Sequence, residues 1–181
     1  METLKLALPV IALVVAALAA RGYRRSQDWS RGELVSGIAE QRDWRYFADE
    51  PGLVDRWPGK PFGRGSEQQV TNVVRGTWAN RKFLAFDYSY VVHHTYDLRE
   101  QEHVPTHFGV VVMQLPGKLP SVEVELGEVG WRIMGGDLLA WERGRVGEDG
   151  LVRRLEFLAE LVGEIPRQVW SEYAEPDPER G

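Results

Sequence analysis

The four histidines of the chain, His93, His94, His103 and His107, lie within one stretch of fifteen residues. Imidazole nitrogens bind zinc, copper and nickel, so this cluster is the first feature that could do chemistry. A zinc site needs three or four ligands that converge on one point. His93 and His94 are adjacent, however, and Pro105 prevents His103 and His107 from sharing one helical face. The two interpretations are therefore a metal site and a polar, histidine-rich loop.

A catalytic His–Asp dyad would need Asp87 and His107 within hydrogen-bond reach of each other. A symmetric turn in the middle of residues 93–105 would place them four positions out of register, about 13 Å apart at about 3.3 Å per residue. The spacing argues against a dyad, and the chain contains no G-x-S-x-G, H-E-x-x-H or G-x-G-x-x-G motif. No catalytic residue is predicted.

The segment from Pro58 to Ser66 is rich in glycine and contains Lys60 and Arg64, as phosphate-binding loops do. Its residue order differs from G-x-x-x-x-G-K-[ST], and no buried strand and following helix flank it. It is either a turn-forming connection or, with the histidines, part of an enzyme, small-ligand or metal site. The absence of cysteine excludes disulfides, a thiolate nucleophile and cysteine-ligated metals, and no cofactor is predicted.

An aromatic stripe is formed by Phe86, Tyr88 and Tyr90, which alternate along a predicted strand and therefore share one face. Aromatic residues are enriched both in cores and in interfaces, so two interpretations stay open. The stripe is either core, or an exposed interaction surface for a protein partner or a second copy of the chain. Two helices can cover only one face of a sheet, which favours neither interpretation outright.

Two helices are predicted. Ser30 and Glu33 form an S-x-x-E capping box, which starts a helix that ends near Asp43. The second helix follows Gly144 and ends near Pro166. It carries an amphipathic stripe of apolar residues at helical spacing: Leu151, Leu155, Leu158, Val162 and Ile165.

Antiparallel strands are expected between the helices. Ala79-Asn80 and Gly135-Gly136 are predicted two-residue hairpin turns, and residues 93–105 are predicted as a polar loop. The strand that begins at His107 is expected to end at Pro116-Gly117. The expected strands are residues 44–47, 70–78, 81–92, 107–115, 130–134 and 137–141.

Charge is distributed unevenly along the chain, whose net charge is −5. Residues 26–181 hold 18 basic and 26 acidic side chains, a net charge of −8. A domain this acidic is a poor non-specific binder of nucleic acid, so no nucleic-acid partner is predicted.

The N-terminal run Leu6–Ala20 contains no charged residue. As a helix it would rise about 22 Å, and flanking residues would help it to span a hydrocarbon core of about 30 Å. Arg21, Arg24 and Arg25 directly follow it, as in a stop-transfer anchor, and the positive-inside rule places the following domain in the cytoplasm. A cleaved signal peptide, with Ala17-Leu18-Ala19 as the cleavage site, and a buried helix are the alternatives.

Several sequence strings together resemble an uncharacterised family of actinobacterial (high-GC Gram-positive) proteins. Members of this family have one N-terminal hydrophobic segment and a small α+β domain of unknown function, and the likeness spans most of residues 35–170. The resemblance implies this organisation and brings no activity, cofactor or site residue. The strings are Pro61–Gly65, Asn72–Gly76, Phe86–Tyr90, Trp131–Trp141 and Ile165–Trp170.

The sequence therefore predicts an α+β domain over residues 30–170, with an antiparallel sheet of about five to six strands covered by two helices. A single-pass transmembrane helix within residues 1–25 precedes it, contacting the membrane through residues 4–20. An acidic disordered tail, 171–181, follows. The predicted function is a non-enzymatic interaction module at the cell membrane that binds a protein partner or its own copies. The alternatives are an enzyme or ligand-binding domain that uses residues 58–66 and the histidines, and a secreted acidic domain.

Overall fold

The structure is a computed structural model and describes residues 31–97, 100–145, 147–167 and 169–170. Within residues 93–97 and 100–104 it describes the backbone and its pairing, without the side chains. The chain divides into two compact units, 1–34 and 35–181. The description below concerns the second unit.

Five antiparallel strands form one sheet, in which each strand pairs with its neighbour in the sequence, in the order β1-β2-β3-β4-β5. A 3₁₀ turn, η1 (Pro51–Leu53), follows β1, and the helix α2 (Glu148–Glu164) follows β5. Residues up to 41 are also helical and precede β1. The predicted α+β class with an antiparallel sheet is confirmed. The strands are β1 (Arg45–Asp49), β2 (Ser66–Trp78), β3 (Arg81–Asp97), β4 (Glu100–Leu126) and β5 (Val129–Arg143).

The turn between β2 and β3 confirms the predicted hairpin. Ala79 and Asn80 both have positive φ, 48° and 61°, and Trp78 pairs with Arg81 across the turn. Positive φ at both central residues is what a type I′ turn requires, and this turn matches the twist of the two strands.

Two predicted strand boundaries are wrong. Residues 93–105 are not a loop, because β3 runs to Asp97 and β4 starts at Glu100. The strand that begins near His107 also does not end at Pro116, because β4 runs to Leu126. The β4–β5 register is interrupted between Gln114 and Leu119, and such an irregularity tolerates a proline without a ladder hydrogen bond.

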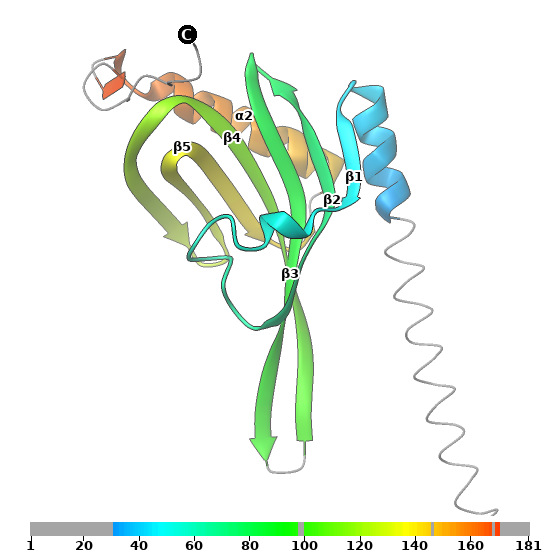
Figure 1. Cartoon of the computed structure of the whole chain (residues 1–181). Coiled ribbons are helices and arrows are strands. Elements are labelled where there is room, and N and C mark those ends of the chain that lie inside the picture. Colours follow the sequence, from blue (N-terminus) through cyan, green and yellow to red (C-terminus); the bar gives the residue numbers. More distant parts are fainter. Residues whose placement is uncertain (1–30, 98–99, 146, 168, 171–181) are drawn as a thin grey trace, which may run out of the picture. The chain divides into compact units, whose positions relative to one another are not determined.

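The predicted turn at Gly135-Gly136 is also wrong, because both glycines lie inside β5. Gly135 has a φ of +59° and pairs with Leu119, between two register shifts, so the pair marks a bend. The strand bends so far that the Arg143 amide donates a hydrogen bond to the Glu128 carbonyl, 3.1 Å away, near the strand's other end. The chain reverses instead between Leu126 and Val129. Figure 1 shows β4 and β5 curling together.

Each face of the sheet carries its own hydrophobic cluster. On one face, Leu155 and Leu158 of α2 and Ala39 of the first helical segment pack against the strands. We call this the helix face. The other face, the strap face, is covered by the connection between β1 and β2, residues 50–65, which we call the strap. Leu53, Trp57 and Phe62 of the strap are buried against it.

Some sequence predictions fall outside the described residues. These are the N-terminal transmembrane helix within residues 1–25, the capping residue Ser30 and the tail 171–181. No helix among the residues that the structure describes is long and apolar enough to cross a membrane.

Candidate functional site

The aromatic stripe is not an exposed surface. Phe86, Tyr88 and Tyr90 are 1%, 0% and 7% exposed, so their prediction as an interaction surface is wrong. The strap covers these three rings. The sequence pattern predicts this segment only as a connection and does not indicate where it lies on the sheet. Trp57 stacks on Phe86 with 5.8 Å between ring centroids, and Phe62 meets the Tyr88 ring edge-on at 4.9 Å.

The strap is fastened to the sheet by polar contacts at two points. The Trp57 indole donates a hydrogen bond to an Asp137 carboxylate oxygen at 2.9 Å, and Arg56 lies 3.6 Å from the same oxygen. Further along, Lys60 forms an ion pair with Glu125 and donates to the Gly127 carbonyl. Lys60, the lysine of the glycine-rich 58–66 segment, therefore binds the tip of the β4–β5 hairpin.

Beneath the strap lies a buried arginine, Arg132 of β5, which is 3% exposed. Its guanidinium carbon is 5.9 Å from the centre of the Phe62 ring and 5.7 Å from that of Trp141. Its Nε and Nη2 atoms are buried and have no hydrogen-bond acceptor among the described residues. Burial lowers the pKa of Arg132, while the charge of Glu123 acts in the opposite direction. A buried cation with two N–H-bearing atoms that lack an acceptor is costly, and the aromatic faces offset only part of this cost.

Two further polar groups on the strap face are buried without a partner among the described residues. They are the indole Nε1 of Trp141 and the hydroxyl of Tyr88. Burial raises the pKa of Tyr88 to about 12. The Gly63 backbone lies close enough to the hydroxyl to lower the pKa of Tyr88 slightly. The geometry between the two groups is nevertheless not that of a hydrogen bond. Arg132 and Tyr88 therefore both lie against the Phe62 ring, and Trp141 lies against Arg132.

Two glycines allow this packing. A Cβ on Gly59, whose φ is +78°, would lie 2.8 Å from the Nη1 atom of Arg132. A Cβ on Gly130 would collide with the six-membered ring of Trp141. The strap and the bent β5 can approach the buried side chains this closely because neither position carries a side chain.

The helix face has a polar group that is internally bonded. The Tyr46 hydroxyl donates to the Asn72 side-chain oxygen, and the Asn72 amide donates to Asp87, each at 3.0 Å. Asn72 has a φ of +53° at a β2 irregularity. Burial, followed by the charges of Asp87 and Asp49, raises the pKa of Tyr46. These contacts fix the irregular part of β2 to β1 and β3.

The strand register corrects the expected position of Asp87 relative to His107. Asp87 pairs with Gly109, and His107 pairs with Ser89, so the two residues are diagonal neighbours on one face, two positions apart rather than four. Diagonal pairs of this kind have Cβ atoms about 7–8 Å apart. The spacing estimate for the dyad was wrong because the two strands pair about residue 98, one position before the middle of residues 93–105, so that His93 pairs with His103.

The histidines fall on both faces of the β3–β4 ladder. His93 pairs directly with His103, and His107 follows on the same face, whereas His94 lies on the opposite face, paired with Glu102. The side chains of His93, His94 and His103 lie outside the described residues. Among the described residues, no group of three or more potential ligands could hold a metal ion.

The ends of β3 and β4 form an arm that projects from the sheet (Figure 1). The last β2–β3 pair joins Ser66 to Val91, and the last β4–β5 pair joins Phe108 to Arg143. Beyond these pairs, residues 92–97 and 100–104 are paired only with each other in the sheet that the structure describes. The arm therefore has free backbone edges.

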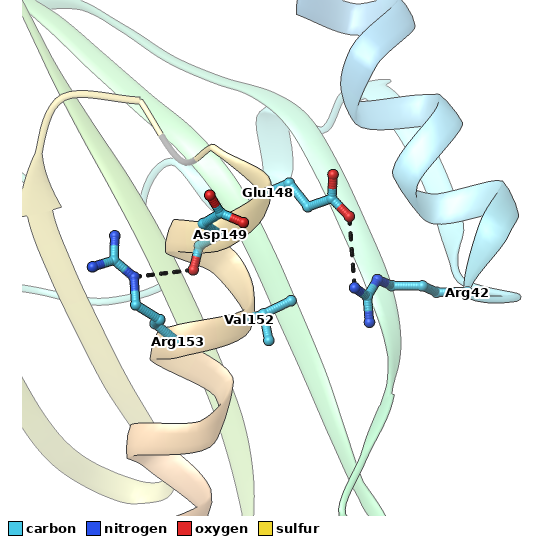
Figure 2. A pocket seen from close by; sticks show the side chains of 5 residues that line it. All are labelled: Arg42, Glu148, Asp149, Val152 and Arg153. Atoms are coloured by element: carbon cyan, nitrogen blue, oxygen red, sulfur yellow. Dashed lines mark hydrogen bonds and ion pairs between the residues drawn. The ribbon is translucent and has the colours of Figure 1, made fainter.

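An open groove of about 520 Å³ lies at the start of α2 (Figure 2). Arg42 is 3.6 Å from Glu148, and Arg153 donates to the Asp149 carbonyl at 3.2 Å. Acidic residues in the first turn of a helix interact favourably with its dipole. Glu148 and Asp149 thus suit the start of α2, and Arg42 lies close enough to Glu148 for an ion pair.

No protein-family model, curated protein or solved structure matches the chain.

Sequence reasoning missed Arg132 as an informative residue, and it missed the position of Pro105 within a strand. Arg132 lies between Trp131 and Ile133, and a charge inside an apolar strand is the signal that could have identified it. Pro105 inside the histidine-rich stretch is compatible with the predicted loop. A proline is equally compatible with the outer edge of a strand.

Proposed function

We propose that this protein is a membrane-tethered, non-enzymatic module that associates with a second copy of itself through the free edge of β3. The observation that carries the proposal is the projecting arm, whose β3 edge is unpaired beyond Val91 within the described sheet. An unpaired edge presents N–H and C=O groups that an added strand can bind.

Pro105 selects the β3 edge over the β4 edge. Proline is accommodated in a ladder where its missing N–H would point away from the neighbouring strand, which here is the outer edge of β4. That edge is therefore interrupted. The pairing of Val91 with Pro105 also makes the backbone groups of Val91 point away from β4. A Cβ on Gly65 would collide with the Val91 carbonyl oxygen, which supports this direction.

Because backbone direction alternates along a strand, His93 and Thr95 share the outward direction of Val91. Two copies of β3 can then pair antiparallel about a twofold axis. An axis at Thr95 pairs each Thr95 with its counterpart and each His93 with Asp97 of the second copy. This register places a basic residue type opposite an acidic one, so we choose it over the alternatives.

The interface would be small. Five paired residues in each copy, 93–97, bury far less than the roughly 1,600 Å² of a standard protein interface. A tether changes this balance, because confinement to a membrane raises the effective concentration of the copies. The hydrophobic segment at residues 6–20, followed by three arginines, supports such a tether, with the domain on the cytoplasmic side.

Cysteine cross-linking tests the association, and the chain itself contains no cysteine. Full-length Thr95→Cys, reconstituted in lipid vesicles and oxidised, should form a disulfide-linked dimer. His93→Cys and Asp97→Cys should cross-link with each other in mixed vesicles but much less with themselves. Glu156→Cys on the exposed surface of α2 is the matched control and should stay monomeric.

A proline substitution separates edge pairing from other modes of association. Thr95→Pro removes an outward N–H and leaves the β3–β4 ladder intact, so cross-linking through a cysteine at position 93 or 97 should fall at least tenfold. Thr95→Ala keeps the N–H and should have no effect. Equal cross-linking at Glu156→Cys, or an undiminished signal in Thr95→Pro, would contradict the proposal.

The location is tested separately with a C-terminal tag and protease treatment of protoplasts. Protection of the tag in intact protoplasts, together with sedimentation with membranes, is the expected result. Digestion from outside, or release into the medium, would overturn the proposed orientation or the tether.

A further inference from the structure

We propose that Arg132 binds the carboxylate group of a small organic acid beneath the strap. The site consists of the Arg132 guanidinium, the Trp141 indole N–H and the aromatic face of Phe62. The ligand reaches the site when the strap lifts from the sheet.

The geometry of the unpaired atoms carries the inference. Nε and Nη2 are neighbouring nitrogens on one edge of the guanidinium, and both lack an acceptor among the described residues. Two parallel N–H groups on this edge match the two oxygens of a carboxylate. The Trp141 Nε1 atom adds a third unpaired donor on a side chain that Arg132 itself contacts. All three atoms can only donate, so the group that satisfies them has to be an acceptor.

The charge of the site favours a carboxylate over a phosphate. A monoanion neutralises one guanidinium, whereas a phosphate dianion would leave a buried negative charge among aromatic rings. Lys60 of the strap already forms an ion pair with Glu125. The site thus offers one guanidinium whose Nε and Nη2 atoms have no acceptor among the described residues.

Glu123 is the internal group that could compete for Arg132. It pairs with Arg132 in the β4–β5 register, and its charge stabilises the protonated guanidinium. Its side chain is exposed, however, and makes no hydrogen bond to the two unpaired nitrogens. Glu123→Gln therefore distinguishes an internal partner from an external ligand.

Benzoate is the probe for the first experiment, titrated into the ¹⁵N-labelled full-length protein at constant ionic strength. One indole N–H resonance, the one missing in Trp141→Phe, should shift and saturate. At ten times its dissociation constant benzoate should raise Tm by about 3–6 °C, and benzamide, its neutral analogue, should not. Inorganic phosphate should bind at least tenfold more weakly.

Variants assign the effect to Arg132. Arg132→Met keeps the apolar stem and should lose the benzoate response, and Arg132→Lys should weaken it at least tenfold because the two-nitrogen edge is gone. Arg75→Met, at a guanidinium already bonded to Glu50, is the matched control and should respond like wild type. Glu123→Gln should bind benzoate as well as or better than wild type.

Three results would overturn the proposal. The first is a wild-type response to benzoate no larger than that to chloride. The second is the same response in folded Arg132→Met. The third is tighter binding of phosphate than of benzoate, which would replace the carboxylate with another oxoanion.

Discussion

The two faces of the sheet differ in whether their buried polar groups have hydrogen-bond partners. On the helix face, Asp87 accepts a hydrogen bond from Asn72, which in turn accepts one from Tyr46. On the strap face, Arg132 and Trp141 keep buried N–H groups without an acceptor among the described residues. Buried polar groups are normally bonded, and an exception calls for a reason. The helix face is built for stability, whereas the strap face keeps donors that suit a ligand.

The largest expected effect concerns the helix face. Leu155 is fully buried under α2, so Leu155→Ala should lower the free energy of unfolding by about 3 kcal/mol, through lost burial and a cavity. Urea unfolding followed by circular dichroism measures this. Glu156→Ala, at the exposed neighbouring position, should change it by less than about 0.5 kcal/mol. A loss below about 1 kcal/mol for Leu155→Ala would mean that α2 does not close this face.

Alkaline pH should reveal the unpaired hydroxyl on the strap face. The pKa of Tyr88 is about 12 in the folded protein, above its ordinary value of 10.0, so the unfolded chain releases the proton first. The contribution of Tyr88 to the free energy of unfolding is fully present below pH 10. About 2–3 kcal/mol of this free energy is lost as the pH rises towards 12.

Unfolding free energies at pH 9 and 11.5, compared with those of Tyr88→Phe, isolate this contribution. The variant should lose the steep part of the pH dependence and should be as stable as wild type at pH 7, because no bonded hydroxyl is removed. Identical pH profiles would show that the hydroxyl is satisfied.

On the helix face, removal of a polar group should be costly. Asn72→Ala leaves Tyr46 without its acceptor and Asp87 without one donor, and should cost about 2 kcal/mol. Asn72→Gly suits the positive φ of this position and should cost less. Thermal unfolding of both variants beside Tyr88→Phe compares the faces directly. A neutral Asn72→Ala would remove the contrast between them.

The smallest expected effect concerns the fastening of the strap. Lys60→Ala removes a half-exposed ion pair and should cost less than about 1 kcal/mol in global stability. It should nevertheless speed amide hydrogen exchange in residues 50–65, because these residues open locally. A loss above about 2 kcal/mol would show a strap too firmly held to admit a ligand.

The sequence predicts the regular parts of this fold well. Ala79-Asn80 is read correctly because the turn is local, and the α2 stripe because its period is helical. Gly135-Gly136 is misread because two glycines serve a bend as well as they serve a turn. The position of the strap depends on contacts between distant residues, such as Trp57 with Asp137, which no local pattern encodes.

The candidate site was predicted less completely than the fold. The glycines and Lys60 make the 58–66 loop recognisable in the sequence. Arg132, which lies against Phe62 of this loop, is not recognisable, because the two residues meet only after β5 bends. The sequence is compatible with the aromatic stripe as core or as surface, and the position of the strap decides between the two. The histidines looked like one cluster in sequence, yet strand alternation divides them between two faces.

The most direct test of the central claim is the free energy of unfolding of Arg132→Met, measured without added ligand. Replacement of an uncompensated buried charge by an apolar side chain of similar length should stabilise the protein by about 2 kcal/mol. A loss of about 2 kcal/mol or more in a folded Arg132→Met would contradict the account. Arg132 would then be a satisfied structural group, and the two faces would not differ as described.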